Sequence, residues 1–117
     1  MIGGGFQSGS ASRTVQARVT QAAGVVPSTR AAVRVNDGRA TLMVRNMPEP
    51  PAEKVYEVWV RRGDRTPAPA GTTFVARSGD IPIAHAVGRG DRVLVTAEPK
   101  GGSQAPTSAP IIVANPA

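Results

Sequence analysis

The fold of this chain is decided by the stretch KVYEVWVRR at residues 54–62. Valine, tyrosine and tryptophan favour strands, and the side chains of a strand alternate between its two faces. Tyr56, Val58 and Val60 therefore share one face, while Trp59 lies on the other. Both faces are mainly apolar apart from Glu57, which is typical of a strand in the middle of a sheet. Residues 54–62 thus predict a central strand, with Trp59 covering its less buried side.

Seven further segments around this stretch have strand-like composition, and turn signals separate them. They are residues 14–20, 32–35, 39–44, 70–76, 81–87, 92–98 and 111–114. Asn36-Asp37-Gly38 predicts a tight hairpin because these residues tolerate positive φ, and Pro82 places its strand at an edge. With no helical stretch, the pattern predicts an all-β fold, a two-sheet antiparallel β-sandwich of Ig-like or Greek-key type with seven or eight short strands.

Length and composition indicate one domain without disulfides. The chain has 117 residues, of which 40% are hydrophobic and 3% aromatic, so valine and alanine must build most of the core. The absence of cysteine excludes disulfides and thiolate metal sites. Residues 1–12 are rich in glycine and serine and predict a flexible leader, leaving residues 13–117 for the sandwich. No apolar run approaches the roughly 20 residues that span a bilayer, and residues 1–10 lack the features of an export signal.

The net charge of +6 raises the question of a nucleic-acid partner. Twelve of the 14 basic residues are arginines, scattered singly or in pairs from Arg13 to Arg92. Proteins that bind nucleic acids usually concentrate charge on one face and interleave aromatic side chains that stack on bases. This chain has four aromatic residues in all. The pattern therefore favours solvated outer faces of strands and no nucleic-acid partner.

Residue types that carry catalysis are scarce and poorly arranged. His85 is the single histidine, so no histidine pair or zinc triad is available, and its alanine neighbours predict a surface or hydrogen-bonded structural role. The nearest carboxylate combinations, Glu49 with Glu53 and Asp64 with Asp80, flank turns, where acidic residues are common for backbone reasons. The sequence therefore predicts no catalytic, cofactor-binding or metal-binding residues, no cofactor, and no enzyme activity.

Two tracts with a fixed order and spacing resemble a known family. Met47-Pro48 opens a proline-rich crossover ahead of residues 55–60, and TAEPKGGS at residues 96–103 is followed by Pro106-Thr107. Together they resemble the C-terminal extracytoplasmic domain of the anti-sigma-K factor family, which tends to have Leu-Pro in place of Met47-Pro48. The resemblance runs from about Arg13 to the C-terminus. The residues of this structural signature are Met47, Pro48, Tyr56, Trp59, Glu98, Pro99, Gly101, Gly102 and Pro106.

The resemblance implies a regulatory role for a larger parent protein. The resemblance implies that the parent is a single-pass membrane protein. Its cytoplasmic region sequesters an alternative sigma factor, and its outer sandwich domain senses a signal or gates the release of that factor. Stepwise cleavage by a membrane protease releases the sigma factor. On this basis the domain lies on the extracytoplasmic side, residues 1–12 are a juxtamembrane leader or a remnant of the expressed fragment, and this chain does not insert into the membrane. The matched positions imply structural roles, so no binding residues carry over.

A second hypothesis comes from another class of protein. A secreted or cell-surface β-sandwich could bind a protein or a cell-envelope ligand directly, as many unrelated sandwiches do. Sugar sites usually show a row of exposed aromatic residues, which four aromatics do not favour. The sequence upstream of this chain separates the two hypotheses. A helical module followed by about 20 apolar residues indicates the anti-sigma protein, and a cleavable signal peptide indicates the secreted one.

Overall fold

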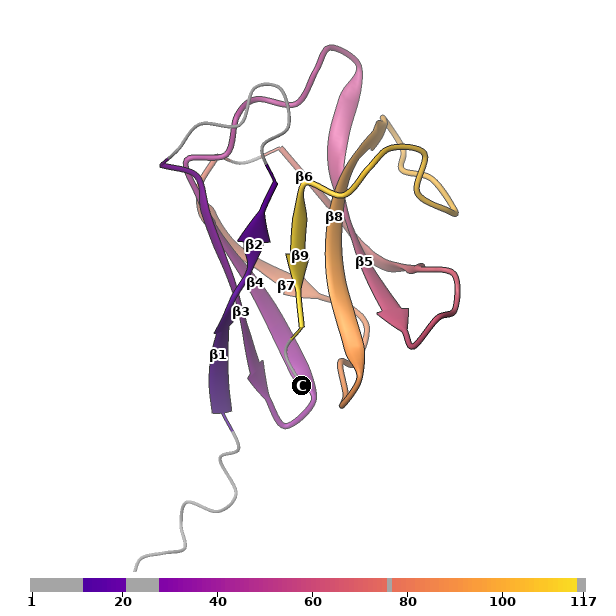
Figure 1. The fold of residues 1–117 in the computed structure, drawn as a ribbon. Coiled ribbons are helices and arrows are strands. Elements are labelled where there is room, and N and C mark those ends of the chain that lie inside the picture. Colours follow the sequence, from indigo (N-terminus) through magenta and orange to yellow (C-terminus); the bar gives the residue numbers. More distant parts are fainter. Residues whose placement is uncertain (1–11, 21–27, 76, 116–117) are drawn as a thin grey trace, which may run out of the picture.

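A computed structural model describes residues 12–20, 28–75 and 77–115, and confirms an all-β chain with two antiparallel sheets consistent with a β-sandwich (Figure 1). One sheet has the strand order β1-β3-β4-β7 and the other β2-β9-β8-β5-β6; they are called sheet A and sheet B. The strands in the described ranges are β1 (Ser12–Gln16), β2 (Arg18–Val19), β3 (Arg30–Asn36), β4 (Arg39–Arg45), β5 (Lys54–Arg62), β6 (Ala68–Phe74), β7 (Gly79–Ile83), β8 (Asp91–Pro99) and β9 (Ile112–Ala114).

The predicted hairpin forms between β3 and β4. Asn36 and Arg39 face each other in the register, so the loop consists of two residues, Asp37 and Gly38. Both have positive φ, 54° and 83°, as a tight two-residue hairpin with a right-handed twist requires. This confirms the hairpin predicted at Asn36-Asp37-Gly38, and the two-residue loop sets the register between β3 and β4.

The predicted central strand is β5, which lies between β8 and β6 in sheet B. It pairs with β8 along its whole length, from Lys54 opposite Pro99 to Arg62 opposite Asp91. Against β6 the register shifts between Glu57 and Trp59, a local irregularity of the kind that strengthens strand twist. The longest strand of the sequence therefore forms the middle of its sheet, as predicted.

The first predicted strand, residues 14–20, is corrected to two strands in different sheets. β1 pairs with β3 in sheet A, whereas β2 pairs with β9 in sheet B. The change of sheet occurs at Ala17, whose N–H donates to the carbonyl of Ala31 at 2.9 Å. This division gives nine strands in the described ranges instead of eight. The alternation of apolar residues continues through Ala17, so it does not reveal the point where the chain crosses.

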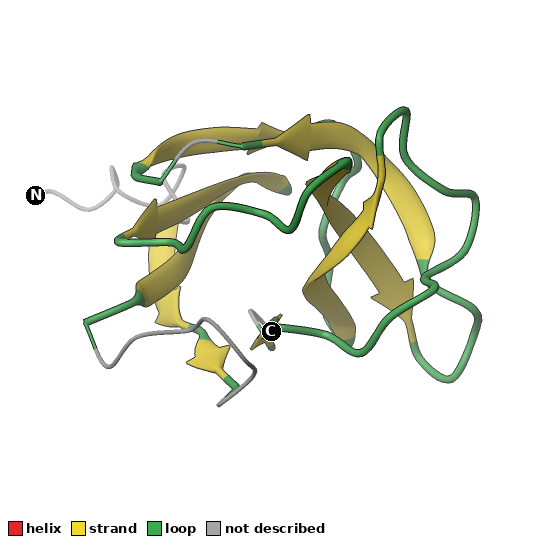
Figure 2. Cartoon of the chain, turned by 90° about the horizontal axis from the view of Figure 1, so that it is seen from above, coloured by secondary structure: helices red, strands yellow, loops and turns green. Residues whose placement is uncertain are grey.

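A backbone hydrogen bond also connects the two sheets on the side where β7 and β6 are the edge strands. The N–H of Ala84, just after β7, donates to the carbonyl of Ala70 in β6 at 3.0 Å. This bond explains why β7 ends at Ile83, earlier than the predicted end at residue 87, because the chain there turns from sheet A towards sheet B. Pro82 lies in β7 at the edge of sheet A, as predicted. Seen from above, the strands of the two sheets stand on opposite sides of the interior (Figure 2).

The interior contains the predicted core. Tyr56, Val58 and Val60 of β5 are at most 2% exposed and share one cluster with residues of both sheets. Tyr56 packs against Phe74, with ring centroids 5.3 Å apart. Most other members are valine and alanine, as the composition predicts. The cluster also includes Val33, Leu42 and Val44 from sheet A and Val93 and Val95 from sheet B.

The predicted leader and the strand predicted at residues 70–76 both extend beyond the described residues. Of the predicted leader, residues 1–12, only Ser12 lies within the described residues, and it begins β1 opposite Asn36. The division of the chain into a leader and a sandwich stays a prediction. The strand predicted at residues 70–76 is β6, Ala68–Phe74, and residue 76 lies outside the described residues.

Candidate functional site

The segment between β8 and β9, residues 100–111, lies against the outer face of sheet B and is called the 100–111 loop. It starts with a turn in which Gly102 donates its N–H to the carbonyl of Pro99 at 2.9 Å. Gly101 and Gly102 both have positive φ, 93° and 80°, a conformation that glycine adopts at no steric cost. The loop returns to β8 where Ile111 donates to the carbonyl of Val95 at 2.8 Å. Glycine at these two positions is thus a backbone requirement.

Glu98 is the centre of the contacts between this loop and the sheet. Its side chain is fully buried. One carboxylate oxygen accepts hydrogen bonds from Ser103 Oγ at 2.8 Å and Thr107 Oγ1 at 2.6 Å. The other accepts from Thr96 Oγ1 at 2.5 Å, and the Thr107 N–H lies 3.1–3.2 Å from both oxygens. Within the described residues Glu98 forms no ion pair, so hydrogen-bond donors alone stabilise this buried carboxylate.

Trp59 fixes the direction of the hydrogen bonds. Its Nε1–H donates to Thr96 Oγ1 at 2.8 Å, so the Thr96 hydroxyl accepts from the indole and gives its own proton to Glu98. Burial acts to raise the pKa of Glu98, but the hydrogen bonds from Thr107, Thr96 and Ser103 together outweigh it and lower the pKa. Donors that point at a carboxylate favour its charged form. Glu98 is therefore ionised at neutral pH.

The burial of Trp59 corrects the expectation that it covers a less buried side of the strand. Its side chain is 0% exposed on the outer face of β5. Glu57, Thr96 and Glu98 on the same face of β5 and β8 are also buried, at no more than 4% exposed. An outer face becomes this inaccessible only if something covers it, and the 100–111 loop bonded to Glu57 and Glu98 lies there. Local alternation cannot predict a cover supplied from forty residues away.

Glu57 is a second buried carboxylate beside Glu98, and its environment is different. It accepts the N–H of Ser103 at 2.7 Å. Burial raises the pKa of Glu57, the Ser103 hydrogen bond opposes this shift, and the charge of Glu98 adds to it. A Cβ at Gly102 would lie 3.1 Å from Glu57 Oε1, so this glycine also makes room for the carboxylate. The environment of Glu57 therefore disfavours its charged form, whereas the environment of Glu98 favours its charged form.

Three further signature residues, Met47, Pro48 and Tyr56, lie at the crossover between the sheets. Met47 is fully buried, and its N–H donates to the carbonyl of Arg77 at 2.8 Å, while Arg77 Nε donates back to the Met47 carbonyl at 3.3 Å. Tyr56 Oη donates to the carbonyl of Pro48 at 2.8 Å, and burial raises the pKa of this phenol. Proline cannot take part in a ladder as a donor, so these three bonds, one between backbone groups and two from side chains, hold the crossover in place.

The nine signature residues thus divide between two places. Met47, Pro48 and Tyr56 lie at the crossover, whereas Trp59, Glu98, Gly101 and Gly102 belong to the outer face of sheet B. Pro99 is exposed at the end of β8, and Pro106 is half-buried in the 100–111 loop. Sequence reasoning did not single out four residues of the network, although Thr96 and Glu98 alternate onto one face as Glu57 and Trp59 do. Thr96, Ser103 and Thr107 lie in the tracts that carry the family resemblance, and Glu57 lies in the central strand, but none of the four belongs to the predicted signature.

A third buried carboxylate closes the turn before β8. Asp91 accepts two hydrogen bonds of 3.1 Å from Arg62 and one of 2.8 Å from the N–H of Gly88. The hydrogen bond from Arg62 lowers the pKa of Asp91, against the effect of burial, and the Gly88 N–H, the charge of Arg62 and that of His85 lower it further. Bidentate pairs of this kind fix geometry as well as charge. Asp91 is therefore a structural clamp on the turn.

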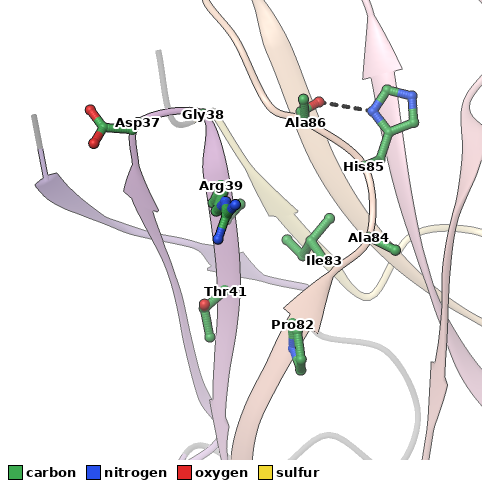
Figure 3. Close-up of a pocket in the computed structure, with 10 residues that line it drawn as sticks. Asp37, Gly38, Arg39, Thr41, Pro82, Ile83, Ala84, His85 and Ala86 are labelled. Atoms are coloured by element: carbon green, nitrogen blue, oxygen red, sulfur yellow. Dashed lines mark hydrogen bonds between the residues drawn. The ribbon is translucent and has the colours of Figure 1, made fainter.

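The described residues contain no group of three or more metal-binding side chains. A hollow of about 470 Å³ lies between the β3–β4 turn and the end of β7, with the side chains of Asp37 and His85 far apart on its two sides (Figure 3). His85 Nδ1 lies 2.8 Å from its neighbour's carbonyl, that of Ala86. Asp64 lies 3.9 Å from Arg61 in the turn after β5, while Asp80 lies in β7 of the other sheet.

We expect Glu57→Gln to stabilise the domain at neutral pH by about 0.5–1 kcal/mol. A carboxyl whose folded pKa is raised opposes folding above its pKa in the unfolded chain, and this penalty is absent when the group is protonated. Glutamine keeps an oxygen for the Ser103 N–H and removes the repulsion from Glu98. Thermal melts at pH 7 and about pH 3 check this. The gain should appear at pH 7 only, and a loss at pH 7 would contradict the assignment.

One of three comparisons with known proteins identifies a family. A protein-family model described as "Anti-sigma-K factor rskA, C-terminal" matches residues 4–111, a range that includes β1 to β8 and the 100–111 loop. The chain is 33% identical over 84 residues to a Streptomyces griseus protein described as "Uncharacterized protein in phr 5'region". The match covers 71% of this chain and 35% of that protein, so the chain spans about a third of its relative. No solved structure is significantly similar.

Proposed function

Because this chain belongs to the family of anti-sigma-K factor C-terminal domains, we propose that it is the extracytoplasmic sensor or gating domain of a membrane-anchored anti-sigma factor. A cytoplasmic module outside this chain sequesters an alternative sigma factor, and a membrane protease that cuts the parent protein releases it. In the described residues no helix is long and apolar enough to cross a membrane. The sandwich acts through its folded state, in a family that is regulatory and non-catalytic.

One observation supports this proposal most strongly: the signature residues secure the fold. Glu98 bonds the 100–111 loop to sheet B through Ser103 and Thr107. Tyr56 bonds the crossover at Pro48. In the described residues neither arrangement forms an open site. A motif that serves only to keep the domain closed fits a domain whose signal is its own folded state.

The N-terminal strand, β1, links the folded state of the sandwich to the segment that a membrane protease can reach. β1 lies at the edge of sheet A, with β3 as its partner. Val15 is half-buried and the other residues of β1 are exposed. Elements with little burial open locally at low free energy, and a protease needs an extended segment to cut. Folding of β1 onto β3 therefore shortens the segment that a membrane protease can reach.

Replacing Trp59 with alanine in the full-length membrane protein tests the proposal. Loss of this buried side chain costs about 3–5 kcal/mol and opens the outer face of sheet B. We expect more cleavage and more sigma-dependent reporter output without any signal, compared with wild type at matched expression. Val75, which is 58% exposed, provides the control variant Val75→Ala, with output like wild type. If cleavage is unchanged although the outer domain is demonstrably unfolded, the gating proposal is wrong. The domain would then be a passive anchor or a ligand-dependent sensor.

The alternative, a secreted module that binds sugars or envelope components, receives less support from this fold. Carbohydrate sites use aromatic side chains that solvent can reach. Among the described residues the three aromatic side chains, Tyr56, Trp59 and Phe74, are at most 9% exposed. A signal peptide directly upstream, in place of a helical module and an apolar span, would favour this alternative.

A further inference from the structure

Burial of acidic side chains makes the surface of this domain more basic than its composition suggests. All basic and acidic residues of the chain lie within the described ranges. Three of the eight acidic residues, Glu57, Asp91 and Glu98, are buried, whereas none of the 14 basic residues is. The electrostatic potential around the domain is therefore set mainly by arginine and lysine.

The strand register gathers four of these arginines on the outer face of sheet A. Arg30 and Arg34 lie on β3, and Arg39 and Arg45 lie on β4. All four are exposed, whereas the alternate residues of the two strands, such as Val33 and Leu42, belong to the core. These four residues are called the arginine face. Within the described residues Arg34, Arg39 and Arg45 form no ion pair, and Asp80 of β7 is the acidic residue on the same face of the sheet. What is scattered in the sequence is thus concentrated by the fold.

One end of the arginine face has the form of an anion site. Arg30 and Arg45 are directly opposite each other in the register, an arrangement of like charges that destabilises a sheet. They flank a shallow hollow of about 320 Å³ whose lining also includes Met43 of β4 and the polar side chains of Thr14 and Gln16 on β1. Two guanidinium groups with a hydroxyl and an amide beside them match the oxygens of a phosphate group.

We propose that the arginine face docks on the anionic surface of a membrane by binding the phosphate groups of phospholipids. This inference rests on the proposed function, which places the domain beside a bilayer. β1, the strand that follows the proposed juxtamembrane leader, lies in sheet A, and its Thr14 and Gln16 line the same hollow. Among the described residues this face has no aromatic side chain for stacking on bases, since Tyr56, Trp59 and Phe74 are buried, and this favours a headgroup layer over a nucleic acid. Docking would hold β1 against the membrane surface.

Vesicle binding by the purified chain tests this inference. Co-sedimentation would compare vesicles of phosphatidylcholine alone with vesicles that contain phosphatidylglycerol, at low and at physiological salt. The variant R30Q/R45Q removes the pair at the hollow. R61Q/R92Q is the matched control, because Arg61 and Arg92 form the corresponding opposed pair on the outer face of sheet B. Thermal melts would show that both variants stay folded.

We expect wild type to bind only the anionic vesicles, and more weakly as salt rises. Each arginine near an anionic surface contributes about fivefold to binding, so R30Q/R45Q should bind roughly 25-fold more weakly and R61Q/R92Q within about twofold of wild type. Equal losses in both variants would show that net charge alone acts and would overturn the proposal. So would an absence of vesicle binding, binding of duplex DNA in its place, or complete competition by millimolar inorganic phosphate. The assay contains no protease or sigma factor, so its failure would leave the Trp59→Ala result unaffected.

Discussion

Replacing Glu98 with glutamine is expected to lower the free energy of unfolding by about 3 kcal/mol, because hydrogen bonds to a buried charge are worth about 1.5–3 kcal/mol each. All the groups that meet the Glu98 carboxylate are donors: the hydroxyls of Thr96, Ser103 and Thr107 and the Thr107 N–H. The glutamine amide places a further donor among them. Urea unfolding followed by the fluorescence of Trp59, the single tryptophan, measures the loss and reports the opening of the 100–111 loop.

Glu57→Gln is the matched control, since it makes the same chemical change on the same outer face. Glu57 accepts one hydrogen bond, from the Ser103 N–H, which a glutamine oxygen can also accept. We therefore expect the two variants to shift the unfolding midpoint in opposite directions at pH 7. A Glu98→Gln protein as stable as wild type would show that the loop is not anchored through this carboxylate.

Protonation of Glu98 in acid should destabilise the domain, whereas protonation of Glu57 should stabilise it. The folded pKa of Glu98 is lowered, so its contribution to stability is present above the pKa of the unfolded chain and is lost as the pH falls through the folded pKa. The pKa of Asp91 is also lowered, so the ionised form of Asp91 likewise contributes stability that is lost in acid. Part of the acid sensitivity of wild type should therefore be missing from Glu98→Gln.

Replacing Val58 with aspartate is expected to unfold the domain at room temperature. Val58 is 0% exposed in the middle of β5, opposite Val95 of β8. An unpaired carboxylate at this position costs several kcal/mol, comparable with the 5–15 kcal/mol that holds a typical domain together. Circular dichroism and a thermal melt would measure the loss. Val75→Asp, at a valine that is 58% exposed, is the control and should melt close to wild type. If Val58→Asp melts within a few degrees of wild type, the interior of the sandwich is wrongly assigned.

The parts of the fold that follow from neighbouring residues could be predicted from the sequence. Asp37-Gly38 fixes a two-residue hairpin through its own backbone preferences. The alternation at Tyr56, Val58 and Val60 determines which side of β5 faces the core. The edge position of Pro82 follows from its missing N–H. In each case the cause lies within a few residues, so the local pattern is sufficient.

The parts that depend on distant partners could not be predicted. The change of sheet at Ala17 depends on the carbonyl of Ala31, and the next contact, from the N–H of Thr20, is with the carbonyl of Ile111. Strand alternation is the same on both sides of the crossing. The arginine face likewise exists only once the register places β3 beside β4.

The candidate site shows the same division between local and distant causes. Order and spacing identified Trp59, Glu98 and the Gly101-Gly102 pair as a signature, without giving the reason for it. The reason is a carboxylate on β8 that accepts donors from a loop nine residues further along the chain, at Thr107. Glu57 could be recognised only as a polar exception in an apolar strand. Its role depends on Ser103, 46 residues away.

If the domain acts as proposed, its folded state restrains cleavage of the parent protein. The most direct measurement is the cleavage rate of the full-length protein in membranes, compared with the free energy of unfolding of the isolated domain, for Glu57→Gln, wild type, Trp59→Ala and Glu98→Gln at matched expression. We expect the rate to be lowest in Glu57→Gln and highest in the two destabilised variants, in step with the loss of stability. Equal cleavage rates in all four proteins, despite different stabilities, would contradict the claim.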